Sequence, residues 1–233
     1  MLLYYITDRK QFPGDASAQE ARLLEVVSAA AQAGVDFIQL REKDLTPREL
    51  ESLARKALAA VRDASSGTNL LINSRMDVAI ATGADGVHLT SSPDELRPDQ
   101  ARVIFAKAGI AQPVIGASCH SAEEVARAES YGADFGVLAP IFQKQDSAHP
   151  PLGIDALRAA CSRPAAAAAK MPVLALGGVT LQNAQTCMEA GAAGIAGIRL
   201  FQESPDKIPA LVTALRNLRA ARQPSPRRHP YKD

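Results

Sequence analysis

The sequence contains no tryptophan, and aromatic residues make up only 4% of the chain. Proteins that bind single-stranded nucleic acid stack bases on aromatic side chains, so this scarcity argues against that class. The formal net charge is only +1, which gives no electrostatic reason to expect nucleic acid or a membrane surface as a partner. No apolar run is long enough to span a bilayer.

Cysteine is also scarce: the chain has Cys119, Cys161 and Cys187, whose spacing matches no metal or redox motif. An odd number of thiols favours a reducing compartment. The N-terminus reaches Asp8 and Arg9 too early for the apolar segment of a secretion signal. We therefore expect a cytoplasmic protein, and its 233 residues are enough for one large domain.

Four segments resemble one another: AGVDFIQL (33–40), TGADGVHL (82–89), YGADFGVL (131–138) and AGAAGIAG (190–197). In each, a glycine follows an alanine-rich amphipathic stretch and precedes a short apolar run. A glycine in this place is typical of a helix C-terminus that needs a left-handed residue. The repeated order of helix, glycine and strand indicates an α/β fold.

Further strand candidates lie between these repeats, at 2–6, 69–73, 113–118 and 172–178. Helical patterns cover about 17–33, 47–64, 75–82, 94–109, 121–131, 153–168, 180–190 and 205–221. Continuously apolar strands indicate a parallel sheet that is buried on both faces. Eight strand–helix units predict a (β/α)₈ TIM barrel over residues 1–221 as a single domain, with an open doubly wound sheet as the alternative.

The segment RQPSPRRHPYKD at 222–233 is basic and rich in proline. That composition is typical of a disordered tail. An arm that binds phosphate or nucleic acid is the alternative.

Polar side chains gather at the ends of the predicted strands, where a (β/α)₈ barrel carries its active site. The second strand ends in FIQLREKD, in which Gln39, Arg41 and Lys43 have the same parity and point the same way if the extended conformation continues. Two cations beside an amide can bind a phosphate or pyrophosphate. The side chains of Glu42 and Asp44 would then point away from this site into solvent and keep this end of the barrel soluble. The alternative is that Arg41 and Lys43 form surface salt bridges with those two carboxylates.

Gly177 and Gly178 follow the seventh predicted strand, ahead of a helix expected to start near Thr180 or Leu181. Free N–H groups at a helix N-terminus attract phosphate, and barrels often bind phosphate after strands seven and eight. A tight turn without a ligand is the alternative. Arg199, just after the eighth strand, would add charge to the same phosphate or cap the barrel with a salt bridge.

The four histidines show no metal-ligand spacing. His88 lies inside a predicted strand, which favours a hydrogen-bonded core residue. His120 and Cys119 follow the fifth strand, but no acidic partner for a nucleophilic triad lies near them in the sequence.

Seven motifs occur in order across about residues 2–200: YYITD, FIQLREKD, LLIN, GADGVHL, IGASCHS, GADFGVLAPIF and PVLALGGV. Together they resemble the thiamine phosphate synthase family, which also includes thiazole tautomerases. The resemblance implies an Mg²⁺-dependent transferase that joins hydroxymethylpyrimidine pyrophosphate to a thiazole phosphate and releases pyrophosphate. It also suggests association into a homo-oligomer.

The resemblance further implies roles for individual residues. Arg41, Lys43 and Asn73 would contact the pyrophosphate, and Ser118 would lie near the bond being broken. Gln39 would contact the pyrimidine, and the backbone of Gly178 would hold the thiazole phosphate. The other substrate-binding candidates are Lys144, Gly177, Ile198 and Arg199.

The chain departs from the family pattern where that pattern binds Mg²⁺. Ser74 stands in place of one metal-binding aspartate, and Pro93 stands in place of the second. Asp94, one residue later, is the nearby carboxylate that we expect to contact a metal. Lys144 and Arg199 would otherwise replace metal charge with protein charge.

The tautomerases have a catalytic histidine where this chain has Pro140, the residue typical of the synthases. His120 is another imidazole near the expected site and a candidate proton shuttle. A synthase is therefore the leading hypothesis. A tautomerase, or a barrel that binds a phosphorylated ligand without catalysis, is the alternative.

Overall fold

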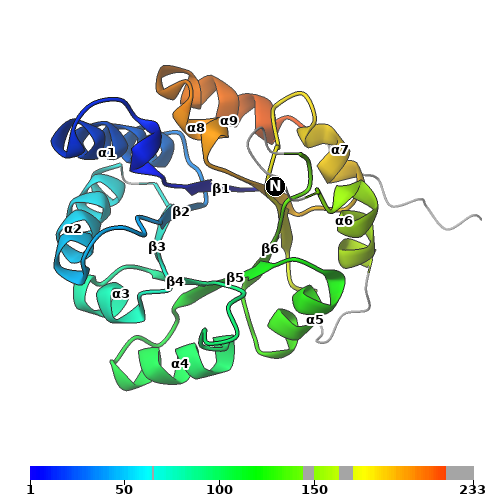
Figure 1. Ribbon diagram of the computed structural model, residues 1–233, viewed down its shortest axis with the longest axis horizontal. Helices are drawn as coiled ribbons and strands as arrows, with labels where there is room; N and C mark the ends of the chain where they lie inside the picture. Colours follow the sequence, from blue (N-terminus) through cyan, green and yellow to red (C-terminus); the bar gives the residue numbers. More distant parts are fainter. Residues whose placement is uncertain (65, 144–149, 163–169, 219–233) are drawn as a thin grey trace, which may run out of the picture.

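Eight parallel strands form a closed barrel in the computed structural model, which describes residues 1–64, 66–143, 150–162 and 170–218 (Figure 1). They are β1 (Leu2–Ile6), β2 (Phe37–Leu40), β3 (Asn69–Asn73), β4 (Gly86–Leu89), β5 (Val114–Cys119), β6 (Phe135–Leu138), β7 (Val173–Ala175) and β8 (Gly194–Gly197). The strands pair in chain order, and β1 pairs with β8 to close the ring. The predicted (β/α)₈ barrel is confirmed, and the open doubly wound sheet is wrong.

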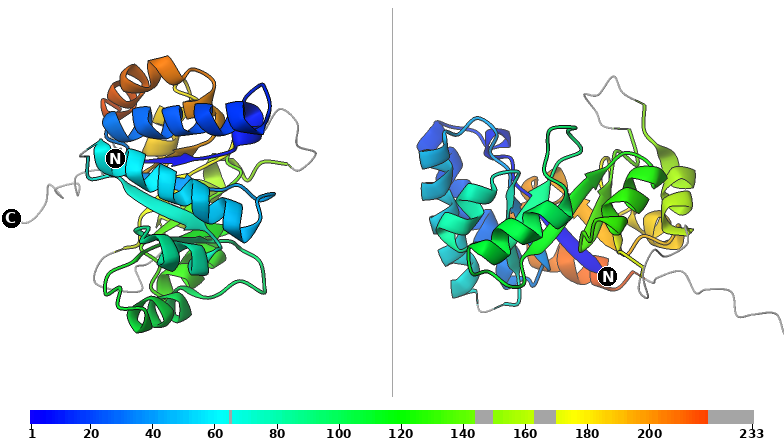
Figure 2. Two further views of the ribbon diagram at one scale, coloured as in Figure 1. Left: turned by 90° about the vertical axis from the view of Figure 1, so that its left-hand side faces the viewer. Right: turned by 90° about the horizontal axis from the view of Figure 1, so that it is seen from below.

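Helices surround the ring of strands (Figures 1 and 2). They are α1 (Ala16–Gln32), α2 (Pro47–Asp63), α3 (Met76–Thr82), α4 (Pro98–Lys107), α5 (Ala122–Ser130), α6 (Gly153–Ser162), α7 (Ala184–Glu189), α8 (Arg199–Gln202) and α9 (Ile208–Arg216), with 3₁₀ turns η1 (Arg9–Gln11) and η2 (Pro205–Lys207). Both α4 and α7 begin four residues later than the patterns predict, and α8 is an element that no pattern predicted. The predicted tail at 222–233 lies outside the described residues.

The start of α2 follows directly from local sequence. Thr46 accepts a hydrogen bond from the backbone N–H of Glu49, whose side chain accepts one from the N–H of Thr46, and Pro47 occupies the first turn. This capping box satisfies N–H groups that a helix start leaves open. The buried face of α2 then recurs at helical spacing, through Leu50, Leu53, Ala54, Ala57 and Val61.

The glycines that lead the four repeats end helices, as predicted. Gly34, Gly83, Gly132 and Gly191 have φ angles of 79°, 72°, 80° and 98°, and they follow α1, α3, α5 and α7. A residue with a Cβ atom is disfavoured in this left-handed conformation. Glycine therefore recurs at these four positions for a steric reason.

Side chains fill the interior of the barrel. The rings of Phe37 and Phe135 stack with centroids 4.7 Å apart, and Tyr4 meets Phe135 edge-on at 5.2 Å. Around them lie the buried residues Ile6, Leu71, Val137, Leu174 and Ala196. Because this interior is packed, a ligand has access only to the mouth of the barrel at the carboxyl ends of the strands.

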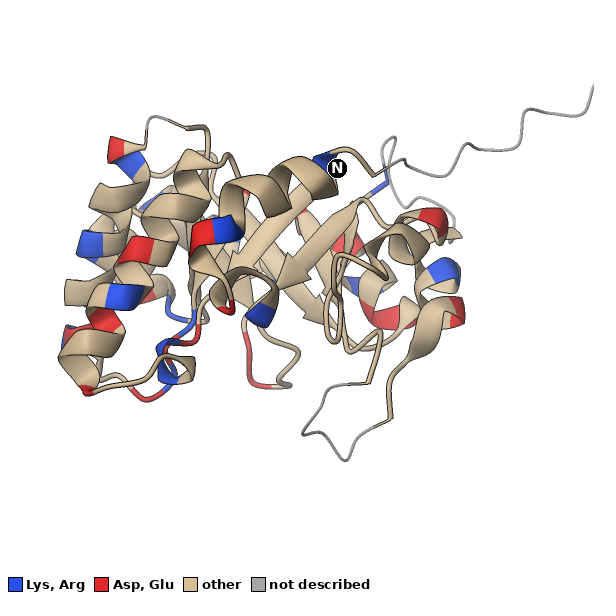
Figure 3. Ribbon diagram, turned by 90° about the horizontal axis from the view of Figure 1, so that it is seen from above, with Lys and Arg blue, Asp and Glu red and all other residues tan. Residues whose placement is uncertain are grey.

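Charged residues of both signs are mixed over the outer helices (Figure 3). This pattern agrees with the near-zero net charge of the sequence. Among the described residues, none of the helices combines the length and the apolar character that a membrane-crossing segment requires.

Gly194 lies where β8 pairs with β1, so we expect Gly194→Ala to destabilise the folded protein strongly. A Cβ atom at Gly194 would lie 2.1 Å from the carbonyl oxygen of Leu2, so the two backbones would have to separate. We expect the free energy of unfolding, measured by urea denaturation, to fall by about 3 kcal/mol. Gly67→Ala is the matched control, since no atom lies within 4 Å of a Cβ there, and it should change this energy by less than about 0.5 kcal/mol. Equal unfolding midpoints for the two variants would contradict the prediction.

Candidate functional site

The strand register brings polar side chains from distant parts of the sequence to one face of the barrel mouth. Gln39 of β2 is in register with Ile6 of β1, and Asn73 of β3 is in register with His88 of β4. The Nε2 atom of His88 lies 2.9 Å from the Oγ atom of Ser118 on β5. Three predicted site residues, on β2, β3 and β5, therefore line the same mouth.

Gln39 has an unsatisfied hydrogen-bond donor. Its side chain is buried, and its Nε2 atom has no partner in the described part of the chain. A buried donor without an acceptor costs roughly 1–3 kcal/mol. A ligand with a hydrogen-bond acceptor in the barrel mouth would remove that cost, so Gln39 has the properties of a ligand-binding group.

A buried hydrogen-bonded chain runs from Tyr4 through His88 to Ser118. The Tyr4 hydroxyl lies 3.1 Å from Nδ1 of His88, and no second partner for that hydroxyl is found among the described residues. The buried phenol therefore donates to Nδ1, which places the imidazole hydrogen on Nε2 and directs it to the Ser118 oxygen. The Ser118 hydroxyl hydrogen then stays available for a ligand. The predicted role of His88 as a hydrogen-bonded core residue is confirmed.

Arg41 is half-buried and acts electrostatically on the barrel interior. Burial, followed by the positive charge of Arg41, lowers the pKa of His88 to about 3. The same guanidinium, followed by burial, lowers the pKa of Lys43. Within the described residues neither cation forms an ion pair with a carboxylate, so the predicted alternative of salt bridges to Glu42 and Asp44 is wrong.

The expectation that Glu42 points into solvent is also wrong. Its side chain is only 2% exposed, and it accepts hydrogen bonds from Thr7 Oγ1 at 2.6 Å and from Arg9 Nη1 at 3.0 Å. Asp44 accepts two hydrogen bonds of 2.7 Å from the same guanidinium. No local pattern indicates this cluster, because Arg9 lies after a different strand.

The double glycine forms a turn and does not start a helix. Gly177 and Gly178 have φ angles of 95° and 65°. The N–H of Thr180 donates to Asn183 Oδ1 at 2.8 Å, and Asn183 Nδ2 donates to the Gly178 oxygen at 2.9 Å, so α7 begins only at Ala184. The prediction of a helix N-terminus here is wrong. The N–H groups of the two glycines nevertheless have no acceptor in the part of the chain that the structure describes, and are open to an anion.

The remaining predicted residues at this end of the barrel are less informative. Ile198 is half-buried and precedes α8, and Arg199 is the exposed first residue of that helix. Lys144 lies outside the described residues.

Glu95 is a site residue that no sequence pattern indicates. Asp94, the predicted metal-binding carboxylate, is exposed, whereas Glu95 is half-buried. Its Oε2 atom accepts hydrogen bonds from Ser74 Oγ at 2.6 Å and from the backbone and side chain of Thr90 at 3.1 and 2.9 Å. Ser74 has a left-handed φ of 56°, a costly conformation for serine that often occurs at functional sites. Only the contact of Glu95 with Ser74, 21 residues away, identifies this carboxylate.

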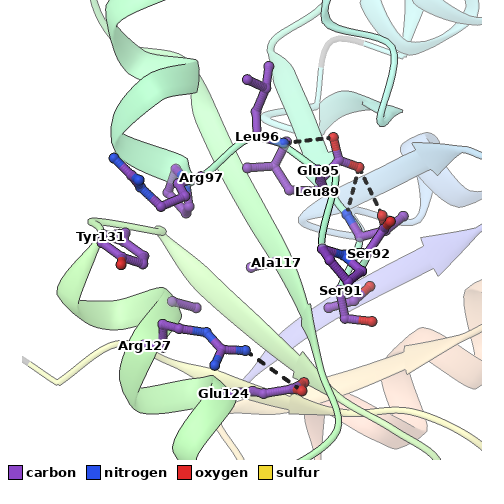
Figure 4. A pocket seen from close by; sticks show the side chains of 15 residues that line it. Leu89, Ser91, Ser92, Glu95, Leu96, Arg97, Ala117, Glu124, Arg127 and Tyr131 are labelled. Carbon is purple, nitrogen blue, oxygen red and sulfur yellow. Dashed lines mark hydrogen bonds and ion pairs between the residues drawn. The ribbon is translucent and has the colours of Figure 1, made fainter.

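A cavity of about 490 Å³ lies between the segment 89–98 and α5, where Arg97 stacks on Tyr131 at 4.8 Å and Arg127 lies 3.8 Å from Glu124 (Figure 4). A second cavity, of about 280 Å³, lies between the ends of β2 and β3. Its polar lining is Glu42, Lys43, Asn73, Ser74, Arg75 and Thr90. The second cavity therefore adjoins the residues predicted to bind pyrophosphate.

Comparison with known proteins gives the family. A model described as thiamine monophosphate synthase matches residues 3–201. The chain belongs to the thiamine monophosphate synthase family. It is 38% identical over 219 residues to the thiamine-phosphate synthase of Methanoregula boonei, covering 93% of this chain and 91% of that protein. It is 39% identical over 198 residues to the thiamine-phosphate synthase of Chlorobium luteolum, covering 83% of this chain and 87% of that protein.

A solved structure supports the same assignment. The thiamine phosphate pyrophosphorylase from Pyrococcus furiosus superposes with a TM-score of 0.73 at 29% identity, covering 93% of this chain and 94% of that one. The family resemblance that the motifs indicate is thus confirmed. A synthase-family barrel is a transferase scaffold, and the mouth described here is its candidate active site.

The buried imidazole of His88 predicts acid sensitivity of this synthase-family barrel. Its pKa is about 3 in the folded protein against an ordinary value of 6.5, so only the unfolded chain binds this proton between those values. Stability contributed by His88 is therefore complete above about pH 6.5 and is lost as the pH falls toward 3, by up to about 1.4 kcal/mol per pH unit. The difference in free energy of unfolding between the natural protein and His88→Asn, measured in urea from pH 7 to pH 4, should shrink accordingly. A constant difference would contradict the prediction.

Proposed function

We propose that this protein joins hydroxymethylpyrimidine pyrophosphate to thiazole phosphate, producing thiamine phosphate and pyrophosphate. The observation that carries the proposal is the buried Nε2 atom of Gln39, which has no hydrogen-bond partner among the described residues and lies at the mouth near the cations Arg41 and Lys43. An amide donor inside the barrel suits a pyrimidine ring nitrogen, and the cations suit the pyrophosphate attached to it. Membership of the family supports the same substrates.

The reaction requires charge stabilisation more than acid–base chemistry. The bond between the pyrimidine methylene carbon and the pyrophosphate oxygen breaks, and its electron pair leaves with pyrophosphate. The thiazole nitrogen then supplies the electron pair of the new carbon–nitrogen bond. Arg41 and Lys43 would stabilise the negative charge that develops on the leaving group.

Neighbouring groups fit the remaining steps. The free hydroxyl hydrogen of Ser118 would donate to the leaving pyrophosphate or its bridging oxygen. His88, with its pKa of about 3, stays neutral near pH 7 and adds no positive charge against the pyrimidine cation. The open N–H groups of Gly177 and Gly178 would hold the thiazole phosphate.

The residues present fit a magnesium ion only with help from the substrate. The described residues contain no group of three or more His, Cys, Asp or Glu side chains that would hold a metal alone. Mg²⁺ prefers oxygen ligands and is commonly held by one or two carboxylates together with substrate phosphates. Glu95, with the hydroxyls of Ser74 and Thr90, offers one carboxylate in an all-oxygen setting. When bound there, Mg²⁺ would neutralise charge on the pyrophosphate.

No observation favours the tautomerase alternative. His120, the candidate proton shuttle, is exposed, and its Nδ1 atom lies 2.8 Å from the carbonyl oxygen of Ala139. That contact occupies one of its two ring nitrogens. The assay below therefore also tests for a tautomerase and for a barrel that binds its ligand without catalysis.

The proposed activity is tested by supplying both substrates with Mg²⁺ and measuring pyrophosphate release and thiamine phosphate. We expect turnover by the natural protein and a loss of at least roughly 100-fold in kcat/KM for Arg41→Ala, because a charge on the leaving group goes unstabilised. Arg55→Ala is the control, since that arginine lies exposed on α2 and pairs with Glu51. Absence of turnover by folded protein would overturn the proposal. Binding of thiazole phosphate alone would then favour the tautomerase, and binding of thiamine phosphate would favour a non-catalytic barrel.

The metal site is tested by electron paramagnetic resonance with Mn²⁺ in place of Mg²⁺. With inorganic pyrophosphate present, Glu95→Gln should weaken Mn²⁺ binding roughly tenfold, because the half-buried carboxylate is lost. Asp94→Asn should leave binding unchanged, since Asp94 is exposed. Weaker Mn²⁺ binding by Asp94→Asn, with unchanged binding by Glu95→Gln, would instead identify Asp94 as the metal-binding carboxylate.

A further inference from the structure

We propose that Glu42 is a positioning residue, which acts through Thr7 and Arg9 to hold the backbone that carries Arg41 and Lys43. The inference rests on the proposed function and deepens it, because it identifies what keeps the two pyrophosphate-binding cations in place. Glu42 lines the second cavity, but its side chain is only 2% exposed and its carboxylate is hydrogen-bonded to Thr7 and Arg9, so its effect on pyrophosphate binding passes through backbone geometry.

The first link runs through the hydroxyl of Thr7, which is fully buried. Its single hydrogen is donated to Glu42 Oε1 at 2.6 Å, which turns an oxygen lone pair toward the backbone N–H of Arg41 at 2.9 Å. A charged acceptor makes the first bond strong and fixes the rotation of the hydroxyl. The carboxylate thus sets the position of the Arg41 backbone through one intervening atom.

The second link runs through Arg9, whose side chain is only 9% exposed. Its backbone N–H and its Nη1 atom both donate to Glu42, at 3.1 and 3.0 Å, and its guanidinium holds Asp44 through two bonds of 2.7 Å. Lys43 lies between these two anchored residues. The segment is therefore held at three points, the N–H of Arg41 and the side chains of Glu42 and Asp44.

Glu42 pairs with Arg9, but direct electrostatics gives no reason for a carboxylate that strengthens pyrophosphate binding here. A negative charge beside two cations that bind an anion weakens that binding by Coulomb repulsion. Removal of the charge should therefore strengthen pyrophosphate binding if Glu42 has no other effect, and weaken it if Glu42 positions the cations. The sign of the change separates the two explanations.

The experiment is a calorimetric titration of each variant with inorganic pyrophosphate, which needs no turnover. We expect Glu42→Gln to weaken binding roughly tenfold, the loss typical of one charge-assisted hydrogen bond. Thr7→Val, which leaves every charge in place, should weaken pyrophosphate binding similarly. Thr7→Ser keeps the hydroxyl and should bind pyrophosphate as the natural protein does. Glu51→Gln, which removes an exposed charge on α2, is the control and should have no effect.

Coupling to Arg41 distinguishes positioning from a general loss of structure. In an Arg41→Ala background, Glu42→Gln should change pyrophosphate affinity by no more than about twofold, since most of its effect passes through the deleted group. An undiminished effect in that background would overturn the inference. If buried substitutions prevent folding, Asp44→Asn tests it at a 37% exposed side chain, where weaker binding supports positioning and tighter binding refutes it.

The two proposals fail in different ways. Tighter or unchanged pyrophosphate binding by folded Glu42→Gln and Thr7→Val would overturn the positioning role while leaving the proposed reaction intact. A natural protein that binds pyrophosphate but transfers no pyrimidine group would overturn only the reaction. A natural protein that binds no pyrophosphate would overturn both.

Discussion

The parallel pairing of β1 with β2 is the interaction on which the rest of the site depends. It places the end of β1 beside the end of β2, while the pairing of β1 with β8 closes the ring. The first pairing brings Thr7 and Arg9 against Glu42, which is 33 to 35 residues further along the chain. Gly194 permits the close approach of the β1 and β8 backbones. Without the pairing of β1 with β2, Glu42 would be a buried carboxylate that has lost these partners, which is costly.

The charges that follow β2 have separate partners. Arg9 is neutralised by Glu42 and Asp44, while Arg41 and Lys43 remain without carboxylate partners among the described residues. The extended conformation ends with β2 at Leu40, and Lys43 and Asp44 lie in a turn, so strand alternation does not set where these side chains point. The contacts of Glu42 and Asp44 with Arg9 separate the two carboxylates from the two cations instead. Arg41 and Lys43 are therefore left available to an anionic ligand.

Much of the fold could be predicted because its signals are local. The left-handed glycines after the helices, the apolar runs of strand length and the Thr46 capping box each act over a few residues. Two features of the site have no such signal. α7 begins only at Ala184 because a local turn, in which the Thr180 N–H donates to Asn183, competes with the helix. The orientation of Glu95 depends on its hydrogen bond with Ser74, 21 residues away, which no local pattern indicates.

The sequence by itself determined the order of strands and helices and the polar residues that follow each strand. These follow from side-chain periodicity and glycine conformation, which need no distant partner. The common direction expected for Gln39, Arg41 and Lys43 required the extended conformation to continue, but β2 ends at Leu40. Only the tertiary structure decided which of those residues are satisfied and which are open to a ligand. Hydrogen bonds such as those of Glu42 with Arg9 join separate strands, and their existence depends on the register of the closed barrel.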